Sequence, residues 1–234
     1  MICANILINK MRKIQSFVRR SGRLTLGQKM GLTELWANYG VDLPKGRINL
    51  DALFVKRQKI VLEVGFGNGD SLLEMAIKIP DRNFLGIEVY EAGIGRLINE
   101  AYKHQLSNLK IIKADAVEVL TNHIKDGSFN RFQLFFPDPW HKKKHHKRRI
   151  VQTDFLDLLS RKIIKGGKVH MATDWAHYAT AMMNTLENHP HFKNTQNGPI
   201  YSPRSEYRPI TKFERRGHRL GHGVWDLIFI NEKT

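Results

Sequence analysis

The middle of the chain alternates strand-like runs with stretches of helical spacing, and this alternation constrains the fold more than any other feature. The strand-like apolar runs occupy residues 60–64, 83–89, 109–114, 132–136 and 168–172. Helical spacing occupies residues 71–79, 91–104 and 153–164. Strands and helices that alternate at such distances form parallel sheets with helices on both faces. The sequence therefore predicts a doubly wound α/β fold with a mostly parallel sheet, to which residues 223–230 are expected to add an antiparallel edge strand.

Composition divides the chain into a basic front and one larger unit. The 234 residues are 41% hydrophobic, which is enough for one sizeable core and short for two independent domains. Residues 1–59 are polar and basic, and we expect them to form an extension packed on or near the functional site. Residues 60–234 are expected to form the single domain that carries this site.

The charge of the chain indicates a polyanionic partner. The formal net charge is +16 and the sequence pI is about 10.0, so the protein is expected to attract nucleic acid or an anionic membrane. No apolar stretch approaches the roughly 20 residues that cross a bilayer. The short apolar start at residues 6–8 precedes its basic residues, unlike a signal peptide. These features favour nucleic acid over a membrane.

Cysteine usage indicates a reducing compartment. Cys3 is the only cysteine, so the chain forms no internal disulfide and no cysteine zinc cluster. A cytoplasmic location is therefore expected.

A glycine-rich turn joins the first predicted strand to its helix and indicates a ligand site. Gly65, Gly67 and Gly69 allow a ligand to approach the backbone at the carboxyl edge of the sheet. The turn departs from the dinucleotide fingerprint, because its third glycine comes one residue early and Asp70 takes the place of a small residue. An acid there would repel a pyrophosphate but tolerate a cation. S-adenosylmethionine carries a sulfonium and an ammonium group and no phosphate, so we expect it as the ligand.

Acidic residues end the next two predicted strands. Glu88 lies at the distance expected for an acid that binds ribose hydroxyls, and Asp115 lies beside Ala116 where an adenine edge would be held. Acids at the carboxyl ends of successive strands point into one crevice, which favours a methyl donor over a nicotinamide cofactor. The alternative is structural, since Asp70 and Asp115 are also suited to cap the helices that follow them.

The sequence Phe-Pro-Asp-Pro-Trp, followed by a basic run, carries the densest functional signal. Prolines on both sides of Asp138 restrict the backbone that presents its carboxylate beside Trp140. The run at residues 141–149 follows at the functional edge of the sheet, where it is expected to bind phosphates. An ordinary turn, a core tryptophan and a solvated loop are the structural alternatives. The histidines of the run lie among six cations and no acid, so no metal site is expected.

Five motifs together resemble the bacterial tRNA (guanine-N7)-methyltransferase family. They are Ser-Phe-Val-Arg-Arg-Ser-Gly-Arg, the glycine turn, Phe-Pro-Asp-Pro-Trp, Ala-Thr-Asp-Trp and Thr-Lys-Phe-Glu-Arg-Arg-Gly, at residues 16–23, 63–69, 136–140, 172–175 and 211–217. The resemblance covers nearly the whole chain apart from its first residues. It implies a class I, Rossmann-like methyltransferase that uses S-adenosylmethionine to methylate a guanine in the variable loop of tRNA.

The resemblance also implies roles for individual residues. Asp138 is the catalytic candidate, and the residues expected at the methyl donor are Glu63, Gly65, Gly67, Glu88, Asp115, Ala116 and Asp138. The residues expected at the substrate guanine are Lys142, Asp174, Thr211, Lys212, Phe213 and Glu214. The residues expected to contact RNA more widely are Lys144, His145, His146, Lys147, Arg148 and Arg149.

The chemistry of guanine assigns Asp138 an orienting and electrostatic role. Guanine N7 carries a lone pair and no proton, so its methylation needs no general base. Asp174 and Glu214 are suited to accept hydrogen bonds from N1–H and the 2-amino group. Two other functions stay open: methylation of an exocyclic amine, whose enzymes usually carry Asn or Asp before two prolines, and RNA binding without catalysis. The sequence leaves both a monomer and a homodimer open.

Overall fold

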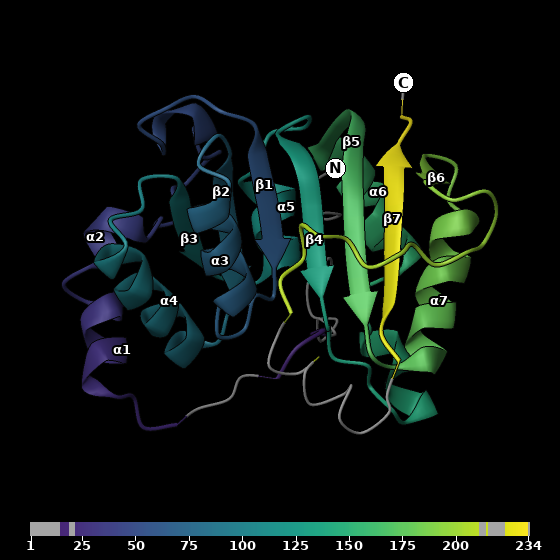
Figure 1. The fold of residues 1–234 in the computed structure, drawn as a ribbon, viewed down its shortest axis with the longest axis horizontal. Helices are drawn as coiled ribbons and strands as arrows, with labels where there is room; N and C mark the ends of the chain where they lie inside the picture. The colour runs from purple at the N-terminus through teal and green to yellow at the C-terminus, as the bar shows by residue number, and fades with distance from the viewer. Residues whose placement is uncertain (1–14, 19–21, 211–213, 215–222, 234) are drawn as a thin grey trace, which may run out of the picture.

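One mixed β-sheet forms the centre of the protein (Figure 1). The computed structural model describes residues 15–18, 22–210, 214 and 223–233. Within these residues the sheet has seven strands in the order β3-β2-β1-β4-β5-β7-β6. The strands are β1 (Ile60–Val64), β2 (Asn83–Glu88), β3 (Leu109–Lys113), β4 (Phe129–Phe135), β5 (Ile163–Thr173), β6 (Phe192–Asn194) and β7 (Trp225–Asn231). β1 to β5 are parallel, and β7 is antiparallel to both β5 and β6.

Helices cover both faces of the sheet, as predicted. They are α1 (Leu26–Leu32), α2 (Trp36–Tyr39), α3 (Asp70–Lys78), α4 (Glu91–Lys103), α5 (Ala116–Asn122), α6 (Thr153–Lys162) and α7 (Ala176–Glu187), with 3₁₀ turns at Leu50–Ala52 and Lys143–Arg148. Buried side chains of α2, α3 and α4 form one apolar cluster with β1, β2 and β3. Those of α5, α6 and α7 form a second cluster with the opposite face, and the side chains of Val41, Ile48, Leu50 and Phe54 join it.

The predicted segments agree with the observed elements to within a few residues, with two informative differences. β4 and β5 begin earlier than their apolar runs, and α5, α7 and β6 carry no clear periodic signal in the sequence. The antiparallel pairing predicted for the C-terminal run is confirmed, because residues 225–230 pair with β5. The three-residue β6 lies outside β7 and takes the edge position itself.

Half of one sheet face lacks a covering helix. α3 and α4 lie over β1, β2 and β3, whereas the segment at residues 200–210 crosses in front of β4, β5 and β7 (Figure 1). Arg208, which is fully buried, attaches this segment to the sheet. Its guanidinium donates to Asp226 of β7 at 2.8 Å and to Glu214 at 2.6 and 2.9 Å. An ion network therefore occupies the place of an apolar helix.

The front of the chain packs on the same core through α1 and α4. A Cβ on Gly31 would collide with the backbone of Gly95, and a Cβ on Gly95 would collide with the carbonyl of Gln28. The two helices therefore approach backbone to backbone. Thr25 is the N-cap of α1 and forms a reciprocal capping box with Gln28. The Thr25 hydroxyl accepts from the backbone amide of Gln28, and the Gln28 side-chain oxygen accepts from the backbone amide of Thr25.

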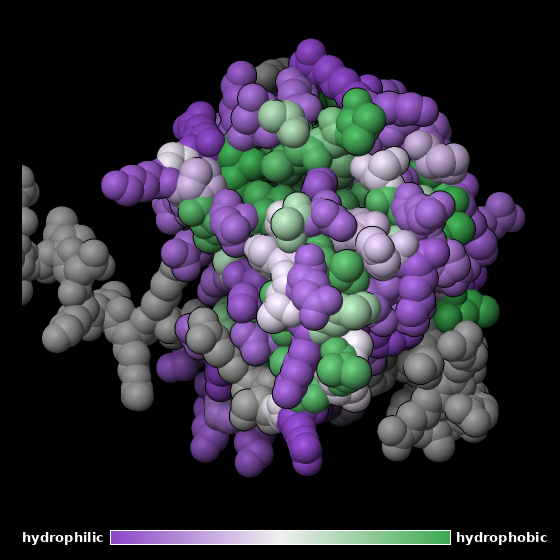
Figure 2. Space-filling view, turned by 90° about the vertical axis from the view of Figure 1, so that its left-hand side faces the viewer, coloured by the Kyte–Doolittle hydropathy of each residue, from purple (hydrophilic) through white to green (hydrophobic). Residues whose placement is uncertain are grey.

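The side of the molecule formed by α1, α2 and α4 is mostly hydrophilic, with apolar residues gathered in its upper half (Figure 2). None of the helices in the described ranges has the length and apolar composition that a membrane crossing requires.

The close approach of α1 and α4 generates a stability prediction. Gly95→Ala should lower the free energy of unfolding by about 1–3 kcal/mol, because overpacking against a backbone carbonyl outweighs the roughly 1 kcal/mol that alanine adds to helix propensity. Urea denaturation measures the change. Gly46→Ala is the matched control, since a Cβ there meets open space. Equal stability of both variants would contradict the backbone contact.

Candidate active site

A cavity of about 310 Å³ opens at the carboxyl ends of β1, β2, β3 and β4. Its size lies within the range of small-molecule sites. The predicted donor residues that line it are Gly65, Gly67, Glu88, Asp115, Ala116 and Asp138. Apolar walls come from Val64, Ile87, Ala114, Leu134 and Ile150. The structure therefore brings together residues that the sequence places at four separate strand ends.

Glu88 attaches the glycine turn to the neighbouring strand. One carboxylate oxygen accepts from the amide of Gly67 at 2.8 Å, and the other accepts from Val89 at 2.6 Å and Tyr90 at 3.0 Å. Gly67 has a φ of 57°, which favours glycine, and a Cβ on Gly93 of α4 would collide with its carbonyl. Backbone amides therefore fix the Glu88 carboxylate at the cavity wall.

Asp115 both caps the helix that follows it and lines the cavity, the two roles that the sequence left open. Its Oδ1 accepts from the amides of Val117 at 2.8 Å and Glu118 at 3.3 Å, and so caps α5. The residue also lines the cavity beside Ala114 and Ala116. Asp70 differs, because its carboxylate pairs with Arg96 at 2.6 Å and does not line the cavity. Small apolar and acidic groups around one space fit the adenosine and the cationic centres of S-adenosylmethionine.

Glu63 is buried beneath this cavity and does not line it. Its Oε2 accepts no hydrogen bond from any described residue. Burial, and next the negative charge of Glu88, raise the pKa of Glu63 to about 8. The neutral acid is therefore favoured at pH 7, and a direct contact of Glu63 with the donor stays a prediction.

The turn that carries Asp138 is stiff. Phe136 and Trp140 on either side of the Pro-Asp-Pro sequence have φ values of 52° and 47°, which cost energy for residues other than glycine. Arg149 holds the turn from inside, since its guanidinium donates to the carbonyl of Pro139 at 2.9 Å. Asp138 itself is exposed and forms part of the cavity wall. The strained turn and the bond from Arg149 therefore hold the Asp138 carboxylate at the wall of the cavity.

The basic strip, defined as Lys142–Arg149, divides into exposed and structural residues. The exposed side chains are Lys142, Lys143, Lys144 and Lys147, while His145, His146 and Arg148 are half-buried. Arg148 lies 3.6 Å from the centre of the Trp140 ring and donates to the carbonyls of Gln15 and Phe17. Arg149 is buried against the Tyr178 ring. RNA contact by Arg148 and Arg149 stays a prediction, and the structure assigns both a structural contact that the sequence did not indicate.

Residues 15–18 close one side of the cavity, a position that the sequence did not specify. Ser16, Phe17 and Val18 line it, and the indole of Trp140 donates to the carbonyl of Ser16 at 3.2 Å. Packing of the whole basic front near the functional site stays a prediction. The signal that identifies these residues is their motif, Ser-Phe-Val-Arg-Arg, rather than any periodicity.

The predicted substrate residues lie in different surroundings. Lys142 is exposed, and Asp174 follows the carboxyl end of β5. Glu214 is fully buried and accepts from Arg208 and from Arg204 at 3.2 Å. Burial alone would raise the pKa of Glu214, but the hydrogen bonds and charge of Arg208 hold it below its usual value. Thr211, Lys212 and Phe213 lie outside the described residues. Contact of these groups with a guanine stays a prediction.

Metal ligands do not gather in the described part of the chain, where no group of three or more His, Cys, Asp or Glu side chains could hold an ion. His141 instead packs edge-on against Trp175, with ring centres 4.2 Å apart. His146 lies 5.0 Å from His177.

The position of Glu88 generates a binding prediction. Glu88→Ala should weaken S-adenosylmethionine binding about 10- to 150-fold, which corresponds to about 1.5–3 kcal/mol for lost charged hydrogen bonds. Calorimetric titration measures this, with Glu91→Ala as a control because Glu91 pairs with Lys113 outside the cavity. Unchanged affinity in Glu88→Ala would exclude a role for this carboxylate in donor binding.

Comparisons with known proteins agree with this geometry. A family model described as "Putative methyltransferase" matches residues 57–227. The tRNA (guanine-N(7)-)-methyltransferase of Ruthia magnifica subsp. Calyptogena magnifica is 64% identical over 193 residues, which cover 82% of this chain and 99% of the relative. The protein of the same name from Saccharophagus degradans is 53% identical over 220 residues, which cover 94% of this chain and 96% of the relative.

Solved structures share the fold at low sequence identity. The 16S rRNA methyltransferase KamB superposes with a TM-score of 0.60 at 16% identity, covering 82% of this chain and 98% of that protein. The 16S rRNA (adenine(1408)-N(1))-methyltransferase from Catenulisporales acidiphilia superposes with a TM-score of 0.54 at 13% sequence identity. This match covers 81% of this chain and 98% of that protein. These likenesses show the class I methyltransferase fold alone. The identities of 64% and 53% to two relatives, over most of each chain, show the family: this chain belongs to the tRNA (guanine-N(7)-)-methyltransferase family.

Proposed function

We propose that this enzyme transfers a methyl group from S-adenosylmethionine to N7 of a guanine in the variable loop of tRNA, forming 7-methylguanosine. The position of Asp138 carries the proposal. Its carboxylate lies in the wall of an acidic cavity, four residues before the basic strip. The relatives are named for N7 methylation of guanine in tRNA. A donor site and an RNA-binding surface therefore meet at one carboxylate.

S-adenosylmethionine supplies an electrophilic methyl group on a sulfonium, and the residues of this chain hold and orient it. Glu88 and Asp115 are suited to bind its ribose and adenine, as their places in the cavity wall indicate. Guanine N7 needs no deprotonation, so the enzyme must bring N7 into line with the methyl group. Such alignment supplies about 7–11 kcal/mol of the barrier.

Asp138 is suited to stabilise the charge that methylation creates. Positive charge appears on the purine as the methyl group is transferred, and a fixed carboxylate near the ring favours this change. A preorganised group of this kind is worth about 3–4 kcal/mol. The strained turn and the bond from Arg149 provide the fixed position.

The exposed lysines of the basic strip are suited to bind tRNA phosphates. The oligomeric state is a monomer or a homodimer, which gel filtration distinguishes. A cytoplasmic location is proposed with this substrate. Mass spectrometry of nucleosides from tRNA incubated with labelled donor tests the reaction, and label on an exocyclic nitrogen would overturn it.

The electrostatic role of Asp138 generates a kinetic prediction. Asp138→Ala and Asp138→Asn should both fold and bind tRNA, yet methylate about 10²–10³ times more slowly, because each removes the charge that opposes the forming cation. Single-turnover assays with labelled donor measure the rate, and alkaline cleavage at 7-methylguanosine locates the product. Full activity of Asp138→Asn would show that shape alone suffices.

The two kinds of residue in the basic strip generate a second prediction. Replacing Lys143, Lys144 and Lys147 by alanine should weaken tRNA binding and reduce its salt dependence by about one unit of slope per lost phosphate contact. Donor affinity should stay unchanged in this variant. Arg148→Ala should instead weaken donor binding, because it releases residues 15–18 from the cavity. An unchanged salt slope in the lysine variant would remove the strip from the RNA surface.

A further inference from the structure

A buried row of polar side chains crosses the sheet on the face that helices cover only in part. Glu63 of β1, Gln133 of β4 and His170 of β5 are cross-strand partners, and at most 2% of each is exposed. Each has one buried atom without a described hydrogen-bond partner: Oε2 of Glu63, Oε1 of Gln133 and Nδ1 of His170. Such groups usually have a partner. Of the three, Gln133 lines a cavity, where a ligand can reach its oxygen.

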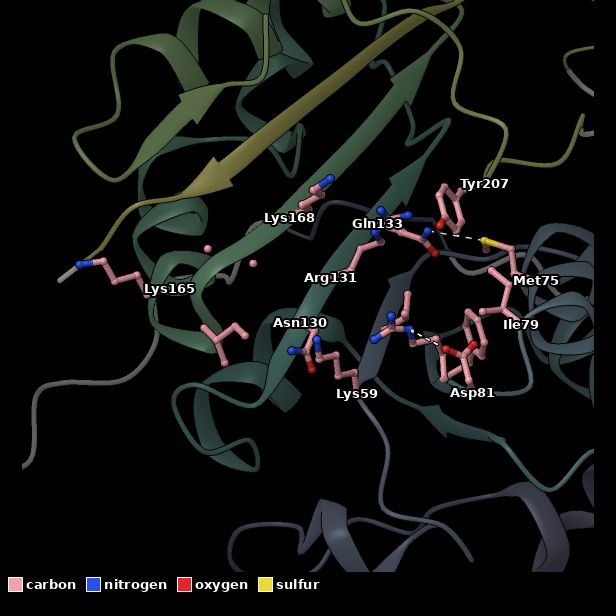
Figure 3. A pocket seen from close by; sticks show the side chains of 16 residues that line it. Lys59, Met75, Ile79, Asp81, Asn130, Arg131, Gln133, Lys165, Lys168 and Tyr207 are labelled. Atoms are coloured by element: carbon pink, nitrogen blue, oxygen red, sulfur yellow. Dashed lines mark hydrogen bonds and ion pairs between the residues drawn. The ribbon is translucent and has the colours of Figure 1, made fainter.

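A cavity of about 380 Å³ reaches this row at Gln133. It lies between α3, the first residues of β1 and β4, and Tyr207 of the crossing segment. Figure 3 shows Arg131 and Gln133 projecting from β4 toward Tyr207 and Met75. The Gln133 amide donates weakly to the sulfur of Met75 at 3.5 Å, which leaves its oxygen as the acceptor at the floor. This cavity shares no lining residue with the donor cavity.

The mouth of this second cavity is strongly basic. Its charged lining residues are Lys59, Asp81, Arg82, Arg131, Lys165 and Lys168, five cations and one acid. The acid only partly compensates, since Asp81 lies 3.7 Å from Arg82. No carboxylate in the described ranges pairs with Arg131, whose pKa is lowered by burial and by nearby Arg82. Lys59, Arg131 and Lys168 line the cavity and form no ion pair with a described residue, whereas the Lys165 side chain points away from the other lining side chains (Figure 3). Unpaired cations at one cavity attract an anion.

Arg131 and Tyr207 also provide a planar surface. The guanidinium of Arg131 lies 4.8 Å from the centre of the Tyr207 ring, and 55% of Tyr207 is exposed. Stacked arginine and aromatic groups are suited to bind phosphates and bases of single-stranded nucleotides. The amide oxygen of Gln133 is an acceptor at the floor, so a sugar hydroxyl is suited to donate to it, whereas a phosphate dianion has no donor.

We propose that this second cavity binds a ribonucleotide phosphate, with the phosphate at Arg131 and its neighbouring cations and a ribose hydroxyl at Gln133. The ligand is either a free nucleotide or one nucleotide of an RNA chain, since both carry the same groups. Methyl transfer does not use this site, because it lies toward the amino ends of β1 and β4, away from Asp138. Bound water would satisfy Gln133 but leave the cations at the mouth without a counterion.

Titration with uridine 5′-monophosphate tests the site. S-adenosylhomocysteine is kept saturating throughout so that the donor cavity is closed to the nucleotide. Arg131→Gln should weaken binding of the nucleotide at least tenfold, and the paired change Lys165→Ala with Lys168→Ala should weaken it severalfold at exposed positions that folding tolerates. Lys125→Ala, an exposed lysine outside both cavities, should bind as the wild type does.

The variant Gln133→Met tests the contact at the floor of the cavity separately from the cations at its mouth. It should weaken the nucleotide but keep inorganic phosphate, and it should not lower Tm, because an apolar group replaces an unsatisfied one. The site is refuted if the wild type binds neither probe, or if binding is lost only on changing the basic strip. Filter binding of tRNA to the Lys165 and Lys168 variant identifies the source. A flatter salt slope indicates an RNA nucleotide, whereas unchanged tRNA binding with lost nucleotide binding indicates a free one.

Discussion

Parallel strands that end at one edge of the sheet determine where the groups of the active site can lie. At this edge the turns leave backbone amides outside the ladder, and Glu88 accepts from three of them. Its carboxylate is held at the cavity wall with no lysine or arginine partner in the described ranges. A fixed acid of this kind suits the ribose hydroxyls of a bound nucleoside. The edge therefore determines the place of the ligand.

Glu63 and Glu88 have different electrostatic environments, although both lie near the carboxyl ends of neighbouring strands. Glu88 has backbone donors, whereas Glu63 lies deeper, and burial with the charge of Glu88 raises its pKa to about 8. A neutral Glu63 avoids two adjacent buried charges. The cavity thereby presents acids at Glu88, Asp115 and Asp138, on three different strand ends.

The other half of the same face is organised by charge in place of apolar packing. Arg208 bridges Glu214 and Asp226, and His170 also contacts Asp226 at 2.7 Å. Buried ion pairs add little net stability, because desolvation offsets their attraction. Their consequence is positional, because they hold the segment at residues 200–210 across β4, β5 and β7. This segment leaves a partly satisfied polar row and a basic cavity where a helix would have formed an apolar layer.

Sequence alone determined the strands and helices of strong periodicity, the doubly wound class and the acids at the cavity, because periodicity and strand ends are local properties. It did not indicate α5, α7 or β6, which carry no clear periodic signal. Glu88, Asp115 and Asp138 could be placed in this way, since parallel strands bring their carboxyl ends to one edge. Only the tertiary structure decided that Arg149 turns inward, that Glu214 is buried and that Ser16 closes the cavity. Ser16 and Trp140 are 124 residues apart in the chain, and no local pattern encodes a contact over that separation. Such contacts form only when the packed sheet brings distant segments together.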